Sequence, residues 1–62
     1  MKIKSTGDRA ITIEFTRNEI GIINNALNEV CNGVDLEGEF ETRMGCNKDD
    51  ALRLLEVIHG LI

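Results

Sequence analysis

The side chains best suited to chemistry in this 62-residue chain are two cysteines and one histidine. Cys31 and Cys46 are far apart in the sequence and neither belongs to a CxxC pair, so neither a zinc site nor a redox motif is predicted. His59 has no serine or cysteine near it in the sequence, so we expect a positive charge at a helix end rather than a general base. The chain is therefore not expected to be an enzyme, and no catalytic residue is predicted.

Alternating acids before residue 40 have the spacing of ligands in a calcium-binding loop. Asp35, Glu37 and Glu39 would be the odd-numbered ligands of such a loop. The loop also requires glycine at its sixth position and glutamate at its twelfth, where this chain has Phe40 and Cys46. The sequence therefore predicts no metal site and no cofactor.

The net charge of −4 comes entirely from the second half of the chain. Residues 35–62 hold seven acidic and three basic side chains, whereas residues 1–34 hold four of each. Because nucleic-acid backbones are bound by Lys and Arg, the acidic excess favours a basic protein as the partner. The candidate partner-binding residues are Glu37, Glu39, Glu41 and Asp49. We expect a small, non-enzymatic interaction protein of bacterial or phage type, with the acidic character of inhibitors and immunity proteins.

Residues 40–55 also have the spacing of a helix-turn-helix unit, with Gly45 in the turn. The inward positions of this unit are Phe40, Met44, Cys46, Ala51 and Leu54. A nucleic-acid-binding regulator is therefore an alternative function. The exposed positions of the second helix are a near-neutral mixture of Lys48, Asp49, Arg53 and Glu56. Nucleic acid is the less favoured partner because this face lacks a positive charge excess.

The elements that position these residues begin with two short strands, predicted at residues 2–5 and 10–15 around a glycine-containing turn. Ile11, Ile13 and Phe15 alternate with polar residues and share one face. Because a two-stranded hairpin is barely stable alone, this face is expected to pack on the helices that follow.

The first helix is predicted at residues 17–32, because Thr16 and Glu19 have the spacing of a capping box. Gly33 is expected to end this helix in the left-handed conformation. A second, short helix is predicted near residues 37–44, although the alternation in residues 34–41 also fits a strand.

The last helix is predicted at residues 48–59, with Asn47 as its cap and Asp49 in reach of Arg53 one turn later. We therefore expect an α+β fold, an N-terminal β-hairpin packed on two or three helices, in a single domain of residues 1–62. The predicted core consists of Ile11, Ile13, Phe15, Ile20, Ile23, Leu27, Val30, Phe40, Met44, Ala51, Leu54, Leu55 and Ile58.

The size of the chain, 6.9 kDa, leaves little margin for stability. A compact chain of this mass exposes roughly 4,000 Å² and buries only about 60% of its unfolded surface. The apolar faces of the two long helices are wider than one core contact requires. A homodimer is therefore expected, with an interface formed by Leu52, Leu61 and Ile62.

An amide stripe on the first helix supports a third hypothesis. Asn24, Asn28 and Asn32 recur along this helix and could bind a small molecule at a dimer cleft. A solvated helix face is the simpler interpretation of the same residues.

Two segments, ALNEVCNG at residues 26–33 and EFETRMG at residues 39–45, precede a leucine-rich helix. This pattern resembles a group of short uncharacterised bacterial proteins, over roughly the last two thirds of the chain. The resemblance supports a helix cap at Gly45 and implies no function. Within the second segment, Arg43 has the spacing to pair with Glu39, four residues back.

Residues 1–8 are polar and lack the apolar region of a signal peptide, and no run of 18 apolar residues occurs. We therefore expect a cytoplasmic protein that does not enter membranes. Cys31 and Cys46 are expected to be free thiols in a reducing compartment.

Overall fold

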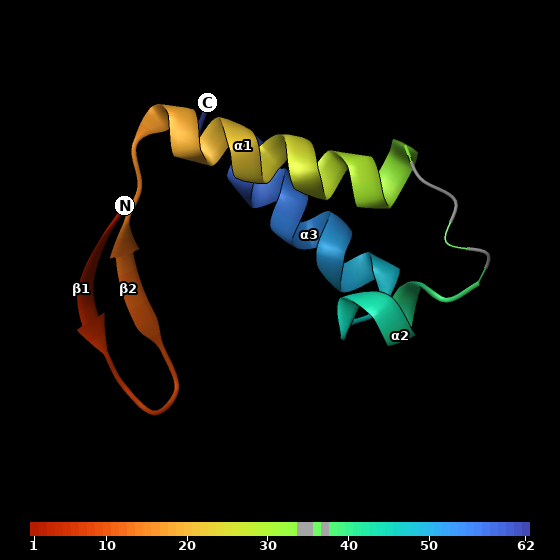
Figure 1. The fold of residues 1–62 in the computed structure, drawn as a ribbon, viewed down its shortest axis with the longest axis horizontal. Coiled ribbons are helices and arrows are strands. Elements are labelled where there is room, and N and C mark those ends of the chain that lie inside the picture. Colours follow the sequence, from red (N-terminus) through yellow and green to blue (C-terminus); the bar gives the residue numbers. More distant parts are fainter. Residues whose placement is uncertain (34–35, 37) are drawn as a thin grey trace.

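The computed structural model describes residues 1–33, 36 and 38–62. An antiparallel β-hairpin precedes a set of helices, which confirms the α+β class (Figure 1). The strands are β1 (Lys2–Thr6) and β2 (Ile11–Glu14). The helices are α1 (Arg17–Asn28), its π-helical continuation η1 (Glu29–Gly33), α2 (Phe40–Met44) and α3 (Lys48–His59). The choice between strand and helix over residues 34–41 falls partly outside the described residues.

The hairpin is amphipathic, as its alternation predicts. Ile3 is paired with Ile13, and Ile11 lies two residues from Ile13, so these three side chains share one face. On the other face Lys4 Nζ lies 3.2 Å from Glu14 Oε2. A bulge between Ile3 and Ser5 interrupts the pairing of β1.

Helix α1 begins with the predicted capping box. The Thr16 hydroxyl accepts from the Glu19 N–H at 3.2 Å, and the Glu19 carboxylate accepts from the Thr16 N–H at 2.9 Å. At its other end the prediction for Gly33 is wrong, because this glycine lies in the π-helical turn and not in the left-handed region. Cys31 lies in this π-helical turn and is buried together with Ala51 and Leu55 of α3.

The core lies where α1, η1 and α3 meet. Cys31, Ala51 and Leu55 are its buried apolar residues. The partly buried side chains packed against them are Leu27, Val30, Phe40, Cys46 and Leu52. The predicted core positions Ala51 and Leu55 are confirmed, whereas Leu54 is wrong, because its side chain is 52% exposed.

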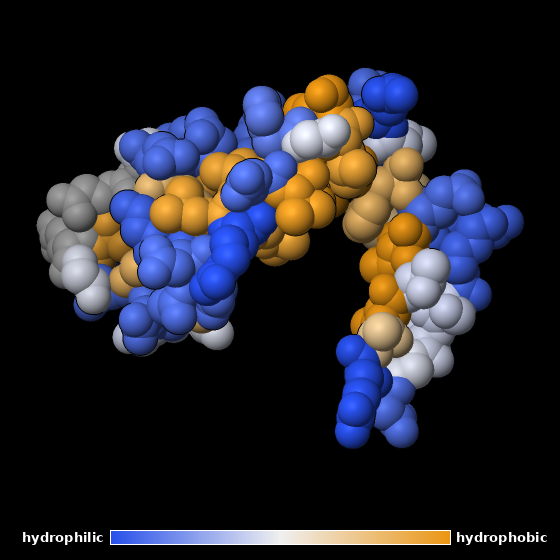
Figure 2. All heavy atoms as spheres, turned by 180° about the vertical axis from the view of Figure 1, so that it is seen from behind, coloured by the Kyte–Doolittle hydropathy of each residue, from blue (hydrophilic) through white to orange (hydrophobic). Residues whose placement is uncertain are grey.

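The hairpin does not pack on the helices in the way that the sequence predicts. It extends away from them, and an open hollow separates its far end from the helical body (Figures 1 and 2). Ile11, expected in the core, is 61% exposed, and only Ile13 and Phe15 near the β2–α1 junction are half-buried. The reason is that the hairpin joins the helices at its open end, so its direction depends on that junction alone.

Candidate functional site

The acidic side chains of residues 39–56 lie on a corner formed by α2, α3 and the turn between them. Gly45 ends α2 in the left-handed conformation, with φ of 72°, and its N–H donates to the Glu41 carbonyl at 2.9 Å. Asn47 then begins α3, because its Oδ1 accepts from the Asp50 N–H at 2.8 Å. Both caps were predicted from the sequence and both are confirmed.

We call this region the acidic corner, defined by the exposed carboxylates Glu39, Glu41, Asp49, Asp50 and Glu56. Two ion pairs lie within it. Arg43 Nε is 3.1 Å from Glu39 Oε2, as the four-residue spacing predicts. Arg53 pairs with Asp50 at 2.9 Å, so the predicted pair of Arg53 with Asp49 is wrong. Side chains three and four residues apart are both neighbours on a helix, and the sequence does not distinguish between them.

The acidic corner keeps unneutralised carboxylates at its surface. Among the described residues, Glu41, Asp49 and Glu56 take part in no ion pair. Lys48 is the remaining cation on the same helix. Residues 39–59 therefore have an excess of two acidic side chains over basic ones. Glu37, the other predicted contact, lies outside the described residues.

A surface groove runs beside these carboxylates. Its volume is about 320 Å³, and Asp49, Leu52, Arg53 and Glu56 line it. The structure thus brings Asp49, a predicted partner contact, beside Leu52, a predicted dimer contact. Leu52 also packs against the buried core, so its side chain supports the fold as well as the groove.

The other two predicted dimer residues lie at different places. Leu61 lines a groove of about 450 Å³ at the junction of the hairpin and the helices, together with Ile13 and Ile58. Ile62 lines a groove of about 620 Å³ on the side of α1, beside Ile22. Leu52, Leu61 and Ile62 therefore do not share one groove.

The asparagines of α1 have different environments, so they do not form one stripe. Asn24 is buried, and its Oδ1 lies 3.2 Å from Nδ1 of His59 at the end of α3. Asn28 accepts a hydrogen bond from Asn32 at the surface, with a distance of 3.0 Å. Asn25 lines the groove beside Ile62. Asn24 was missed as a structural residue because its partner is distant in the sequence.

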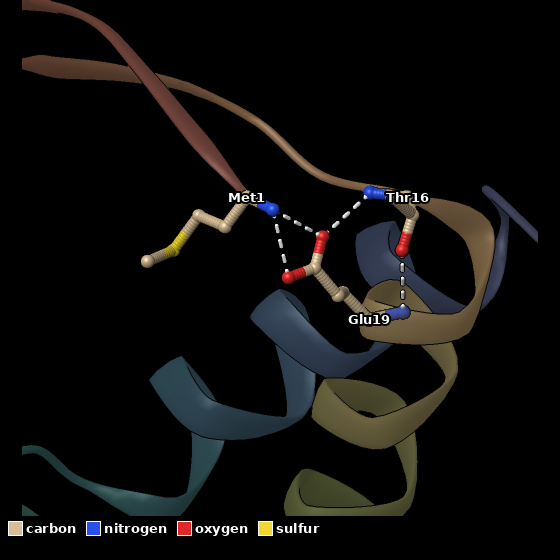
Figure 3. Close-up of polar contacts among 3 residues, drawn as sticks. All are labelled: Met1, Thr16 and Glu19. Atoms are coloured by element: carbon tan, nitrogen blue, oxygen red, sulfur yellow. Dashed lines mark hydrogen bonds and ion pairs between the residues drawn. The ribbon is translucent and has the colours of Figure 1, made fainter.

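A second long-range contact ties the start of the hairpin to the start of α1. The Met1 α-ammonium nitrogen lies 2.8 Å from Oε1 and 2.9 Å from Oε2 of Glu19 (Figure 3). The hydrogen bond from this ammonium group lowers the pKa of Glu19, and the Thr16 N–H acts in the same direction. No local sequence pattern indicates this pair.

No three His, Cys, Asp or Glu side chains within residues 1–33, 36 and 38–62 are grouped so that they could hold a metal ion. Over the same residues, no helix is both long and apolar enough to cross a bilayer. Cys31 and Cys46 are free thiols, the first buried and the second half-buried.

Comparisons of this chain with protein-family models, with curated proteins and with solved structures found no match. The resemblance to short bacterial proteins therefore stays a hypothesis, and functional inference depends on the geometry of the chain itself.

Proposed function

We propose that this protein is a non-catalytic interaction protein that docks, as a homodimer, on a basic protein through its acidic corner. The observation that carries the proposal is the set of exposed carboxylates on α2 and α3 that exceeds the nearby cations. A basic partner would gain charge complementarity there, which mainly increases association rate and specificity.

The two ion pairs within the corner do not oppose this role. Arg43 and Glu39 are both more than half exposed, and so are Arg53 and Asp50. Exposed pairs of this kind contribute only about 0 to 1 kcal/mol, so a partner's cations can exchange with them at little cost. The groove beside Asp49 adds the side chain of Leu52 as an apolar contact next to the charges.

Charge also argues against the nucleic-acid alternative. The exposed residues of α3 include Asp49, Asp50 and Glu56 against Lys48 and Arg53. A duplex would meet like charge at this helix, and nucleic-acid affinity depends on Lys and Arg releasing counterions.

The test is a charge reversal of the acidic corner. Glu41→Lys with Asp49→Lys changes two exposed carboxylates that have no ion-pair partner among the described residues. A matched control, Asp8→Lys with Glu29→Lys, makes the same change in net charge on the hairpin turn and on η1, both outside the corner.

Basic proteins captured by the immobilised native chain would be identified, and their binding to each variant measured at low and high salt. We expect the corner variant to lose binding, the control to keep it, and salt to weaken the native complex. Equal binding by the native chain and the corner variant would overturn the proposal. Binding of duplex DNA at low salt that is strengthened by the same reversal and lost when Lys48 and Arg53 are replaced by alanine would favour the regulator instead.

A further inference from the structure

The chain exposes more surface than a compact protein of its mass. Its accessible surface is 5076 Å², about 1,100 Å² above the value expected for 6.9 kDa. Its radius of gyration is 13.0 Å, against about 10.6 Å for a compact domain of this length. A stable dimer buries about 800 Å² on each partner. The excess surface is therefore of the size that one dimer interface would cover.

Part of the excess is the uncovered face of the hairpin. We call this the hairpin face, formed by Ile3, Ile11 and Ile13. Ile3 is 60% exposed and Ile11 is 61% exposed. Figure 2 shows hydrophobic atoms along the side of the hairpin that borders the open hollow. A two-stranded hairpin is marginal in water unless a helix or further strands cover its apolar face.

A second uncovered apolar surface lies on α3 and its end. Leu54 and Val57 are three residues apart on one side of this helix, and Leu61 follows in the turn after its end. Their exposed fractions are 52%, 64% and 57%. We call these residues the α3 stripe. The molecule thus has a hairpin face that is largely uncovered, and an α3 stripe that meets the hairpin only where Leu61 shares a groove with Ile13.

We infer that the hairpin face of each chain covers the α3 stripe of a second copy, in a reciprocal, two-fold dimer. In such a dimer, the hairpin face of the first chain contacts the α3 stripe of the second, and the hairpin face of the second contacts the α3 stripe of the first. Both apolar surfaces of each chain are therefore covered at once. This assignment rests on the proposed homodimer and names its interface. Of the three residues predicted for the dimer interface, this arrangement retains Leu61. The hairpin face takes the place of Leu52 and Ile62.

Charge and strand geometry favour a second copy in this arrangement. The hairpin face and the α3 stripe contain no charged residue, so two chains with a net charge of −4 can meet there without local repulsion. The edges of the hairpin are poor sites for strand addition, because β2 has four residues and β1 carries a bulge and Lys4. Contact through the face is therefore favoured over pairing through the edge.

The first part of the experiment measures mass in solution by sedimentation equilibrium over a dilution series. Ile11→Lys places a charge on the hairpin face at an exposed position, and Thr12→Lys places the same charge on the opposite face of the same strand. We expect the native chain and Thr12→Lys to be dimers. We expect the Ile11→Lys dimer to dissociate with a dissociation constant raised about 100-fold or more.

The second part tests which surfaces meet. Val57→Glu places the opposite charge on the α3 stripe, and this variant alone is also expected to be monomeric. An equimolar mixture of Ile11→Lys and Val57→Glu should recover a heterodimer, because one of its two contacts joins Lys to Glu and the other keeps the native side chains. Circular dichroism of each variant would show whether the helices remain folded.

The outcomes separate the inference from the proposed function. An Ile11→Lys chain that dimerises as tightly as the native chain overturns the hairpin assignment while the homodimer stands. Two monomeric variants that do not recover a dimer on mixing overturn the pairing of hairpin with α3. A native chain that is monomeric at every concentration overturns the homodimer itself.

Discussion

The α-ammonium group of Met1 lies 2.8 Å from the carboxylate of Glu19, and this pair joins the start of β1 to the first turn of α1 (Figure 3). The same carboxylate caps the helix by accepting from the Thr16 N–H. One side chain therefore helps to set both the start of α1 and the direction in which the hairpin leaves it.

This relationship predicts a pH dependence of stability. The pKa of Glu19 is lowered in the folded chain, chiefly by the Met1 ammonium group. Below the ordinary glutamate pKa, about 4.3, the unfolded chain takes up a proton that the folded chain still excludes. The stabilisation from Glu19 is therefore present above that pH and is lost as the pH falls through the lowered, folded-state pKa.

Glu19→Gln would show this effect in urea unfolding followed by circular dichroism over a pH series. We expect the variant to be less stable than the native chain at neutral pH and the difference to disappear in strong acid. Glu56→Gln, the same chemical change on an exposed α3 carboxylate, serves as the control. A Glu19→Gln difference that does not vary with pH would contradict this interpretation.

Glycine substitutions should have opposite signs at two positions. Gly45→Ala is expected to destabilise the fold by about 1 kcal/mol, because φ is 72° there and a side chain disfavours that conformation. Gly21→Ala is expected to stabilise it by about 0.5 to 1 kcal/mol, because Gly21 lies within α1 and a methyl group would meet no atom within 4 Å. Free energies of unfolding from urea titrations would test both, and equal effects at the two positions would exclude this explanation.

The cap of α3 should contribute measurably to stability. Asn47→Ala removes the acceptor of the Asp50 N–H and is expected to cost about 1 kcal/mol. Asn47→Ser retains a capping oxygen and should recover most of the loss. The measurement is again the free energy of unfolding, and an unchanged value for Asn47→Ala would show that the cap is replaced by water.

Asn24 should be the asparagine of α1 on which the fold depends. Asn24→Ala removes the buried partner of the His59 ring between α1 and α3 and is expected to cost about 0.5 to 1.5 kcal/mol. Asn28→Ala, at an exposed position on the same helix, is expected to change stability by less than about 0.5 kcal/mol. Similar losses for both variants would show that the contact with His59 does not determine the effect.

Hydrogen exchange should report the proposed cover of the hairpin. The amides paired between β1 and β2 are expected to exchange faster on dilution, because a separated chain leaves the hairpin face in water. The exchange rates of amides around Leu55 in the α1–α3 core should change much less on dilution than those of the hairpin amides. Mass spectrometry at high and low protein concentration would compare the two regions, and protection of the hairpin that does not depend on concentration would oppose the dimer.

Local features of this fold could be predicted because they depend on residues a few positions apart. The capping box of Thr16 and Glu19, the left-handed Gly45 and the Asn47 cap each satisfy backbone groups within one turn. The start of α3 at Lys48 follows from the Asn47 cap. The acidic corner could be predicted for the same reason, since its charge lies in a contiguous part of the chain.

The sequence by itself determined where α1 and α3 begin, which faces are apolar and where the acidic charge lies. Only the tertiary structure decided that the hairpin extends away from the helices, that Asn24 meets His59 and that Met1 meets Glu19. It also left Ile11 and Leu54 exposed where an alternating or helical pattern predicts burial. The physical reason is that a pattern shows which side chains share a face, whereas burial depends on the direction in which each element leaves its junction.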